Sequence, residues 1–179
     1  MEFIETLIQR NAEFALNGFN AGLKILPSQR TMILGCVDPR VDPMDVLGLQ
    51  PGEAAIIRNV GGRVDPAFFE TMDILRTVSK AGGEEVGRGW SLVLLQHTKC
   101  GIKGCYHHAP ALLAQQMRVE EPDLAQLEIN DPYKAVAIDV AALRDHPSIP
   151  GDFTVSGLVY DVDTGLVDTV VAPARLRPA

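Results

Sequence analysis

Apolar and polar positions along the chain follow two patterns, one typical of buried strands and the other of amphipathic helices. Short, nearly continuous apolar runs between turn residues indicate strands buried on both faces, at residues 31–34, 54–57 and 91–95, and residues 153–161 are predicted to form a longer strand. Elsewhere apolar residues recur every three or four positions, which predicts helices over residues 2–24, 66–80, 109–118 and 131–144, with a short one over 44–47. Strands that alternate with helices predict an α/β fold with a mainly parallel central sheet flanked by helices.

Turn residues mark the ends of these elements. Asp42, Asp65 and Asp131 each precede a proline, which is the expected order of an N-cap followed by the first helical residue. Residues 119–130 are acidic and irregular and are expected to form a surface loop. Residues 163–165, Asp-Thr-Gly, predict a tight turn, after which residues 166–171 return as the second strand of a C-terminal hairpin.

The domain organisation follows from length and continuity. A chain of 179 residues can bury one core, and it contains no repeat, linker or low-complexity segment, so residues 1–179 are expected to form a single domain. Residues 1–26 form an N-terminal helical arm whose apolar face is unusually wide. Such a face could cover a neighbouring subunit as easily as the arm's own core.

Composition narrows the class of protein. The formal net charge of −7 argues against nucleic acid as a partner, because phosphate binding requires a basic face. No apolar run is long enough to span a membrane, and the first ten residues lack the layout of an export signal. Three cysteines, an odd number, favour metal or thiol chemistry over a disulfide framework, and a cytoplasmic location is expected.

The candidate chemistry lies directly after three of the predicted strands. The first strand leads into Cys36, Asp38 and Arg40, the second into Arg-Asn-Val-Gly-Gly at residues 58–62, and the third into His-Thr-Lys-Cys-Gly at residues 97–101. Functional groups of open α/β sheets collect beyond the carboxyl ends of the strands. We therefore expect these three segments to form one site.

The donor atoms in these segments suit zinc. Cysteine thiolate and imidazole are both zinc ligands, and three protein ligands with one open position are typical of a catalytic site. Cys36, His97 and Cys100 would supply them. Taken alone, Cys36 would more often be a small buried apolar residue, and His-x-x-Cys is a weak pattern. The zinc interpretation depends on all three occurring at strand ends.

Asp38 and Arg40 suit the chemistry of a water molecule bound at such a centre. The carboxylate can orient the water, and a bidentate bond from the guanidinium keeps the carboxylate ionised and out of the open metal position. Taken alone, the two residues would more often be a surface ion pair of little energetic value.

Together these residues resemble the β-class carbonic anhydrases. The three-part motif is Cys36-x-Asp38-x-Arg40, Arg58-Asn59-x-Gly61-Gly62 and His97-x-x-Cys100-Gly101, and residues 155–166 are similar to that family's closing strands. The resemblance, over about residues 30–170, implies a Zn²⁺ ion bound by Cys36, His97 and Cys100. It assigns Asp38 and Arg40 as catalytic, and Gly61, Gly62 and Gly101 as substrate-binding.

The resemblance also implies an activity and an assembly. The activity is reversible hydration of carbon dioxide to bicarbonate and a proton, by attack of zinc-bound hydroxide. The assembly is a homodimer or homotetramer in which the N-terminal helix lies over the partner.

Departures from the family pattern leave other activities open. Compact members commonly carry an acidic residue in place of Lys99, many others a glycine in place of Gln96, and a substrate-binding glutamine of plant-type members has no counterpart. One alternative is hydrolysis of carbonyl sulfide or carbon disulfide on the same scaffold. A second is a non-catalytic zinc-binding module, which requires a fourth protein ligand such as Cys105.

Overall fold

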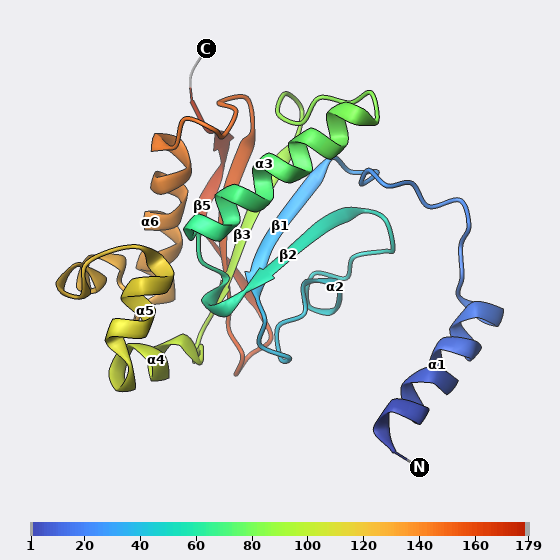
Figure 1. Cartoon of the computed structure of the whole chain (residues 1–179), viewed down its shortest axis with the longest axis horizontal. Helices are drawn as coiled ribbons and strands as arrows, with labels where there is room; N and C mark the ends of the chain where they lie inside the picture. Colours follow the sequence, from blue (N-terminus) through green and yellow to red (C-terminus); the bar gives the residue numbers. More distant parts are fainter. Residues whose placement is uncertain (1, 178–179) are drawn as a thin grey trace.

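The computed structural model describes residues 2–177 and contains a five-stranded sheet flanked by helices (Figure 1). The strands are β1 (Thr31–Cys36), β2 (Ala54–Asn59), β3 (Ser91–His97), β4 (Thr154–Tyr160) and β5 (Val167–Arg175). Their order across the sheet is β2-β1-β3-β4-β5, and all neighbours are parallel except the antiparallel pair β4 and β5. The predicted α/β architecture, its parallel centre and its C-terminal hairpin are confirmed.

The helices are α1 (Phe3–Asn17), α2 (Pro43–Val46), the 3₁₀ helix η1 (Val60–Gly62), α3 (Pro66–Ala81), α4 (Ile102–His108), α5 (Pro110–Met117), the 3₁₀ helix η2 (Glu121–Leu127) and α6 (Pro132–Asp145). Three of them, α2, α3 and α6, begin where the Asp-Pro pairs predict. Asp42, Asp65 and Asp131 each accept a hydrogen bond from a first-turn backbone N–H of α2, α3 and α6 respectively. Within residues 2–177 every helix is too short or too polar to cross a lipid bilayer.

Three segments differ from the expectation. The first helix ends at Asn17 rather than near residue 24, because Gly18 follows and the backbone turns at residues 20–23. The expected loop at 119–130 contains η2, whose Leu124 is buried in an apolar cluster. The last strand extends to Arg175, since β4 offers it a partner as far back as Thr154.

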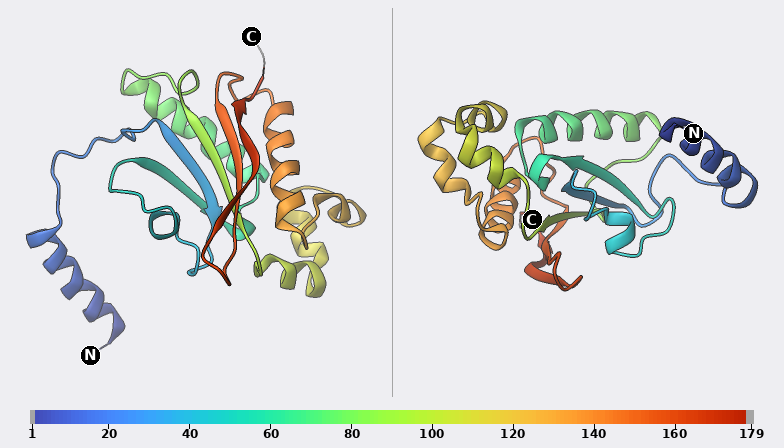
Figure 2. Two further views of the ribbon diagram at one scale, coloured as in Figure 1. Left: turned by 180° about the vertical axis from the view of Figure 1, so that it is seen from behind. Right: turned by 90° about the horizontal axis from the view of Figure 1, so that it is seen from below.

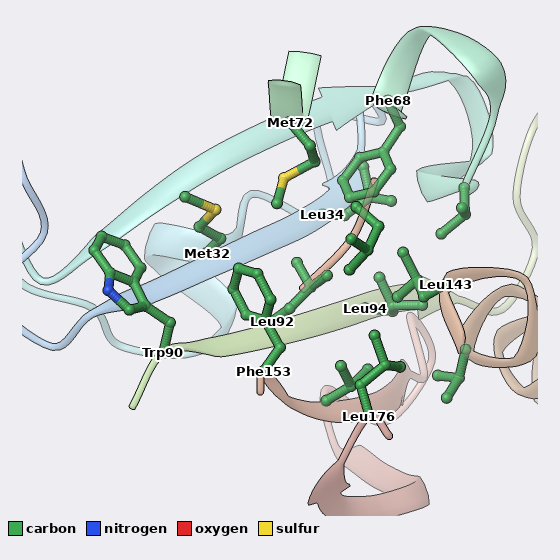
Figure 3. Close-up of a cluster of buried hydrophobic side chains, with 14 of the residues drawn as sticks. Met32, Leu34, Phe68, Met72, Trp90, Leu92, Leu94, Leu143, Phe153 and Leu176 are labelled. Carbon is green, nitrogen blue, oxygen red and sulfur yellow. The ribbon is translucent and has the colours of Figure 1, made fainter. Parts of the chain in front are cut away.

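The main apolar core lies between one face of the sheet and helices α3 and α6 (Figure 3). Alternate residues of β1 and β3 point into it, as the period of two in a strand requires. Trp90, which precedes β3, is 2% exposed and belongs to this core. Its members include Met32, Leu34, Phe68, Met72, Trp90, Leu92, Leu94, Leu143, Phe153 and Leu176.

A second, smaller apolar cluster encloses the carboxyl ends of β1 and β3. It includes Val41, Ile102, Leu113 and the two cysteines Cys36 and Cys100. The strand ends that carry the candidate chemistry therefore lie in a largely water-excluded part of the molecule.

The helix α1 makes no comparable contact with the rest of the chain. It extends away from the sheet in every view (Figures 1 and 2), and none of its residues is buried. Seven large apolar side chains in and just after it are exposed: Phe3, Ile4, Leu7, Ile8, Phe14, Leu16 and Phe19. So much exposed apolar surface on one short helix is typical of an interaction surface.

Candidate metal centre

The parallel register of the sheet places the three predicted strand ends side by side. Gly35, the residue before Cys36, is opposite Arg58 of β2 and Leu95 of β3. Cys36 therefore lies within reach of His97, which ends β3. The segments predicted to converge do so at one edge of the sheet (Figure 1).

The side chains of Cys36, His97 and Cys100 come together there. Their ligand atoms all lie within 4.8 Å of one another, and the Sγ atoms of Cys36 and Cys100 are 3.8 Å apart without a disulfide. His97 is 1% exposed, and its Nε2 has no hydrogen-bond partner among the described residues. A buried imidazole nitrogen left unpaired beside two thiols fits a bound zinc ion, because a metal satisfies this nitrogen where no hydrogen bond does.

The tautomer of His97 follows from its other ring nitrogen. Nδ1 lies 2.8 Å from the carbonyl oxygen of Thr98, which can only accept, so Nδ1 carries the hydrogen and Nε2 presents its lone pair. A metal-binding histidine is commonly oriented in this way by a backbone carbonyl.

The short segment between His97 and Cys100 is held in a tight turn. Lys99 adopts a left-handed conformation with φ of 53°, which reverses the chain. The Thr98 hydroxyl donates to Asp161 and accepts from the N–H of Val162, so the turn is tied to the loop that follows β4. Lys99 stands where compact family members commonly carry an acidic residue, and its ammonium group lies 2.7 Å from Asp163 in an exposed ion pair.

The surroundings of Cys36 favour its thiolate, which is the form that binds metal. The backbone N–H groups of Gly61 and Asp38 donate to its Sγ at 3.3 and 3.5 Å. The hydrogen bond with the Cys100 thiol, together with these N–H groups, lowers the pKa of Cys36 well below its usual value despite burial. The pKa of Cys100 is raised, because its proton is shared with Cys36 and because it is buried.

Asp38 and Arg40 form the pair that the sequence predicts. Arg40 Nε donates to Asp38 Oδ1 at 3.0 Å and Nη2 to Oδ2 at 2.6 Å. These bonds hold the pKa of the Asp38 carboxyl well below its usual range. Asp38 Oδ2 is 4.0 Å from His97 Nε2, so the carboxylate borders the space into which the ligand atoms point. Arg40 Nη2 also donates to the carbonyl oxygen of Lys99 at 3.1 Å, which links the pair to the ligand turn.

Arg58 holds the loop that follows β1 through hydrogen bonds that its sequence context did not indicate. Its guanidinium donates to the carbonyl oxygens of Cys36 and Asp38, both at 2.8 Å, and to Asp42 Oδ2 at 2.6 Å. One side chain thus fixes the loop that carries Cys36 and Asp38. As a residue of the Arg-Asn-x-Gly-Gly motif it was noticed, but nothing in the sequence specifies these three acceptors.

The three glycines assigned to substrate have different surroundings. Gly61 has a φ of 87°, and its N–H is used by Cys36 Sγ. At Gly62 a Cβ atom would lie 3.0 Å from the backbone N of Cys36, so any side chain would push the turn off β1. Gly101 is exposed, and a Cβ there would meet no atom within 4 Å, which leaves open space beside Cys100.

The remaining cysteine and the two histidines near the site lie outside the group of ligand atoms. Cys105 lies outside the ligand group, with its Sγ 3.8 Å from the carbonyl oxygen of Ala109. His107 and His108 are exposed at the end of α4. A cavity of about 530 Å³ lies at the opposite edge of the sheet, where it is lined by Arg30, Trp90 and the neighbouring loops.

A buried polar cluster behind the ligands was not predicted at all. Arg63, Asp139 and Gln96 are each at most 3% exposed, and Arg63 and Gln96 both donate hydrogen bonds to Asp139. With His97 and Cys100, Arg63 and Gln96 line a small cavity of about 10 Å³. Asp139 offered no signal in the sequence, because it stands alone on a helix far from the motifs.

Comparison with known proteins agrees with this geometry. A family model described as carbonic anhydrase matches residues 31–167. A carbon disulfide hydrolase of Acidianus sp. is 29% identical in an alignment that covers 91% of this chain and 86% of that protein. Beta-carbonic anhydrase 1 of Mycobacterium bovis is 26% identical over 95% of this chain and 99% of that protein.

The solved structures give the same result. The crystal structure of carbonic anhydrase from Streptococcus mutans is 32% identical, covers 95% of this chain and 98% of that chain, and has a TM-score of 0.74. The family match runs from the first residue of β1 to the first residue of β5 and so includes all three strand ends. The chain therefore belongs to the β-carbonic anhydrase family.

Proposed function

We propose that this chain catalyses the reversible hydration of carbon dioxide to bicarbonate and a proton, with one zinc ion held by Cys36, His97 and Cys100. The observation that carries the proposal is the unpaired Nε2 of buried His97. The ligand atoms of His97, Cys36 and Cys100 lie within 4.8 Å of one another, and Nε2 is 4.0 Å from Asp38 Oδ2. Two of these donors are 64 residues apart in the chain. Family membership supports the same assignment.

The proposed mechanism divides the work between the metal and the polypeptide. When bound, zinc is a Lewis acid that lowers the pKa of water enough to provide a nucleophile near neutral pH. Asp38, ionised and held by both oxygens, accepts a hydrogen bond from the reacting water and directs its lone pair toward carbon. Arg40 keeps the carboxylate in that orientation and stops it from taking the water's place.

The substrate side of the site is proposed to lie over Gly101. The absence of a side chain there leaves room for a small linear molecule to approach the ligand group. Gly61 and Gly62 are proposed to act differently from the sequence-based assignment. They shape the turn whose Gly61 N–H donates to Cys36 Sγ, and they do not contact substrate.

Hydrolysis of carbon disulfide or carbonyl sulfide is the second candidate. The 29% identical relative from Acidianus is named a carbon disulfide hydrolase, and all three substrates are linear triatomic molecules that the same donor set could serve. A non-catalytic zinc module is less well supported. It needs a fourth protein donor, and among residues 2–177 the ligand group contains three.

We also propose that the chain is one domain that assembles as a homodimer or homotetramer in the cytoplasm, with residues 1–26 packed on a partner subunit. The exposed apolar side chains of α1 support the assembly. The sheet face opposite α3 and α6 also supports the assembly. Central parallel strands are normally covered on both faces, but Val93 and Leu158 on this face remain partly exposed. Three free cysteines agree with a reducing compartment.

The substrate is tested by parallel assays on one zinc-loaded preparation. We expect one zinc per chain and rapid carbon dioxide hydration in a stopped-flow indicator assay at about pH 8.5, with slower or no release of hydrogen sulfide from carbon disulfide and carbonyl sulfide. Hydrogen sulfide release that clearly outpaces bicarbonate formation would select the second candidate. No turnover of any of the three would contradict both enzyme proposals.

The catalytic pair is tested by Asp38→Ala and Arg40→Ala. Because neither side chain is a proposed ligand, both variants should keep one zinc per chain. Asp38→Ala should lose about 10²- to 10⁴-fold in kcat for carbon dioxide, the usual range for a group that handles a proton. Asp45→Ala, an exposed carboxylate on α2, is the control and should retain full activity. Retention of most activity by Asp38→Ala would rule out its catalytic part.

The pH dependence should come from a group other than Asp38. The folded pKa of Asp38 is lowered by Arg40, so the carboxylate stays ionised from pH 6 upward and loses its charge only in strong acid. Activity should nevertheless rise between about pH 7 and 9, because two thiolate ligands acidify water less than three imidazoles would. Initial rates across this range check the prediction, and a profile that is flat from pH 6 would contradict it.

The N-terminal arm is tested by a charge on its apolar face. Ile8→Asp should shift the protein to a smaller species in sedimentation velocity, since a buried unpaired carboxylate opposes association. Gln9→Glu adds the same charge to the same helix outside the apolar face, at an exposed position beside Glu5 and Glu13, and should leave the assembly unchanged. If both variants sediment like the unmodified protein, α1 is not part of the interface.

A further inference from the structure

Arg63 and Gln96 both donate hydrogen bonds to Asp139 and form with it a buried polar network inside the protein. Arg63 Nε and Nη2 donate to the two carboxylate oxygens of Asp139 at 2.8 and 3.0 Å, and Gln96 Nε2 donates to Asp139 Oδ2 at 2.7 Å. Arg63 Nη2 also reaches the carbonyl oxygen of Leu127 in η2 at 3.0 Å. Burial raises the pKa of Asp139, and these N–H groups oppose that shift by stabilising its ionised form.

Stability alone is a poor reason for such a network. Removing two charges from water is costly, and apolar residues of similar volume commonly replace a buried ion pair without loss of stability. The pair joins residues 76 positions apart, one beside η1 and the other on α6. Its most direct effect is therefore to fix the position of the segments that it connects.

Those segments carry the metal centre. Gln96 directly precedes His97 in β3, so its bond to Asp139 anchors the end of that strand. Arg63 closes the turn of residues 59–63, where the side chain of Asn59 bonds both its N–H and its carbonyl oxygen. The same turn presents the Gly61 N–H to Cys36 Sγ. One carboxylate on α6 thus connects two of the three donor residues.

The network also lies close to the candidate ligands. Arg63 and Gln96 line the same small cavity as His97 and Cys100. No side chain outside this network joins α6 to both β3 and the residue 59–63 turn through hydrogen bonds among the described residues.

We propose that Asp139, with Arg63 and Gln96, is a positioning unit for the metal centre, which sets metal affinity and turnover by fixing the Gly61 N–H and His97. The inference depends on the proposed metal site and adds residues to it. None of the three residues is proposed to touch substrate or metal.

Two variants cut the network without leaving a buried unpaired charge. Gln96→Met removes the bond to β3 and leaves the Arg63–Asp139 pair whole. The double variant Arg63→Met/Asp139→Leu removes both charges together. Both should fold, which circular dichroism and thermal unfolding of the metal-free protein establish first.

The readouts are zinc affinity by chelator competition, the absorption spectrum of the cobalt-substituted protein, and kcat for carbon dioxide. Both variants should lose about 10- to 100-fold in zinc affinity, the usual effect of removing a partner that orients a ligand. Their cobalt bands should shift, because those bands report ligand geometry. Leu143→Ala, on the same helix α6 but in the main core, is the control for lost stability.

Each outcome decides the proposal. Weaker zinc binding and a shifted cobalt spectrum in both network variants, with a normal spectrum in Leu143→Ala, support it. Unchanged affinity and spectrum in both network variants, or equal losses in Leu143→Ala, overturn it while the proposed function stands. A parent protein that binds zinc but turns over no substrate refutes the proposed function alone, and the affinities still judge the network. A parent protein that binds no zinc refutes both.

Discussion

The parallel alignment of β1 with β3 is the constraint on which the rest of the site depends. Gly35 lies opposite Leu95, so Cys36 follows beside the last residues of β3. The apolar pattern enforces this register, because Met32 and Leu34 share a core face with alternate residues of β3. A slip of one residue would expose that core and separate the thiol from the imidazole. The same burial that stabilises the sheet therefore also assembles the donors.

Charge balance imposes a second constraint at the strand ends. Two thiols and the carboxylate of Asp38 meet in a region from which water is largely excluded, and Arg40 neutralises only the carboxylate. Without a cation the second thiol keeps its proton, as the raised pKa of Cys100 indicates. A divalent ion would compensate both thiolates and satisfy His97 Nε2 at once. The local electrostatics of this chain are complete only with such an ion.

Much of this arrangement could be predicted because it depends on local sequence patterns. Apolar runs locate the parallel strands, Asp-Pro pairs locate three helix starts, and the rule that groups collect at strand ends brings Cys36 to His97. What could not be predicted depends on contacts between distant segments. η2 forms because Leu124 finds an apolar cluster, and β5 lengthens because β4 is there to pair with it.

The ion-pair partners of buried and exposed charged residues could not be predicted for the same reason. Arg63 and Asp139 read as ordinary charged residues in a sequence, and only the fold removes both from water and pairs them. Lys99 departs from the family pattern in the sequence, and only the fold shows that a loop after β4 supplies Asp163 to pair with it. A residue's type is visible in the sequence, whereas its partner across 60 or more positions is a property of the packing.

The ligand turn shows how the fold offsets local strain at the site. Lys99 holds a left-handed conformation that costs a residue with a side chain of order 1 kcal/mol or more, and it lies between two donors. Three tertiary contacts oppose relaxation: Arg40 to the Lys99 carbonyl, the Thr98 hydroxyl to Asp161, and the Lys99 ammonium to Asp163. Because Arg40 also donates to Asp38, the side chain that restrains the turn orients the Asp38 carboxylate as well. Ligand geometry and the position of Asp38 are thus mechanically linked, and a change in either must be transmitted to the other.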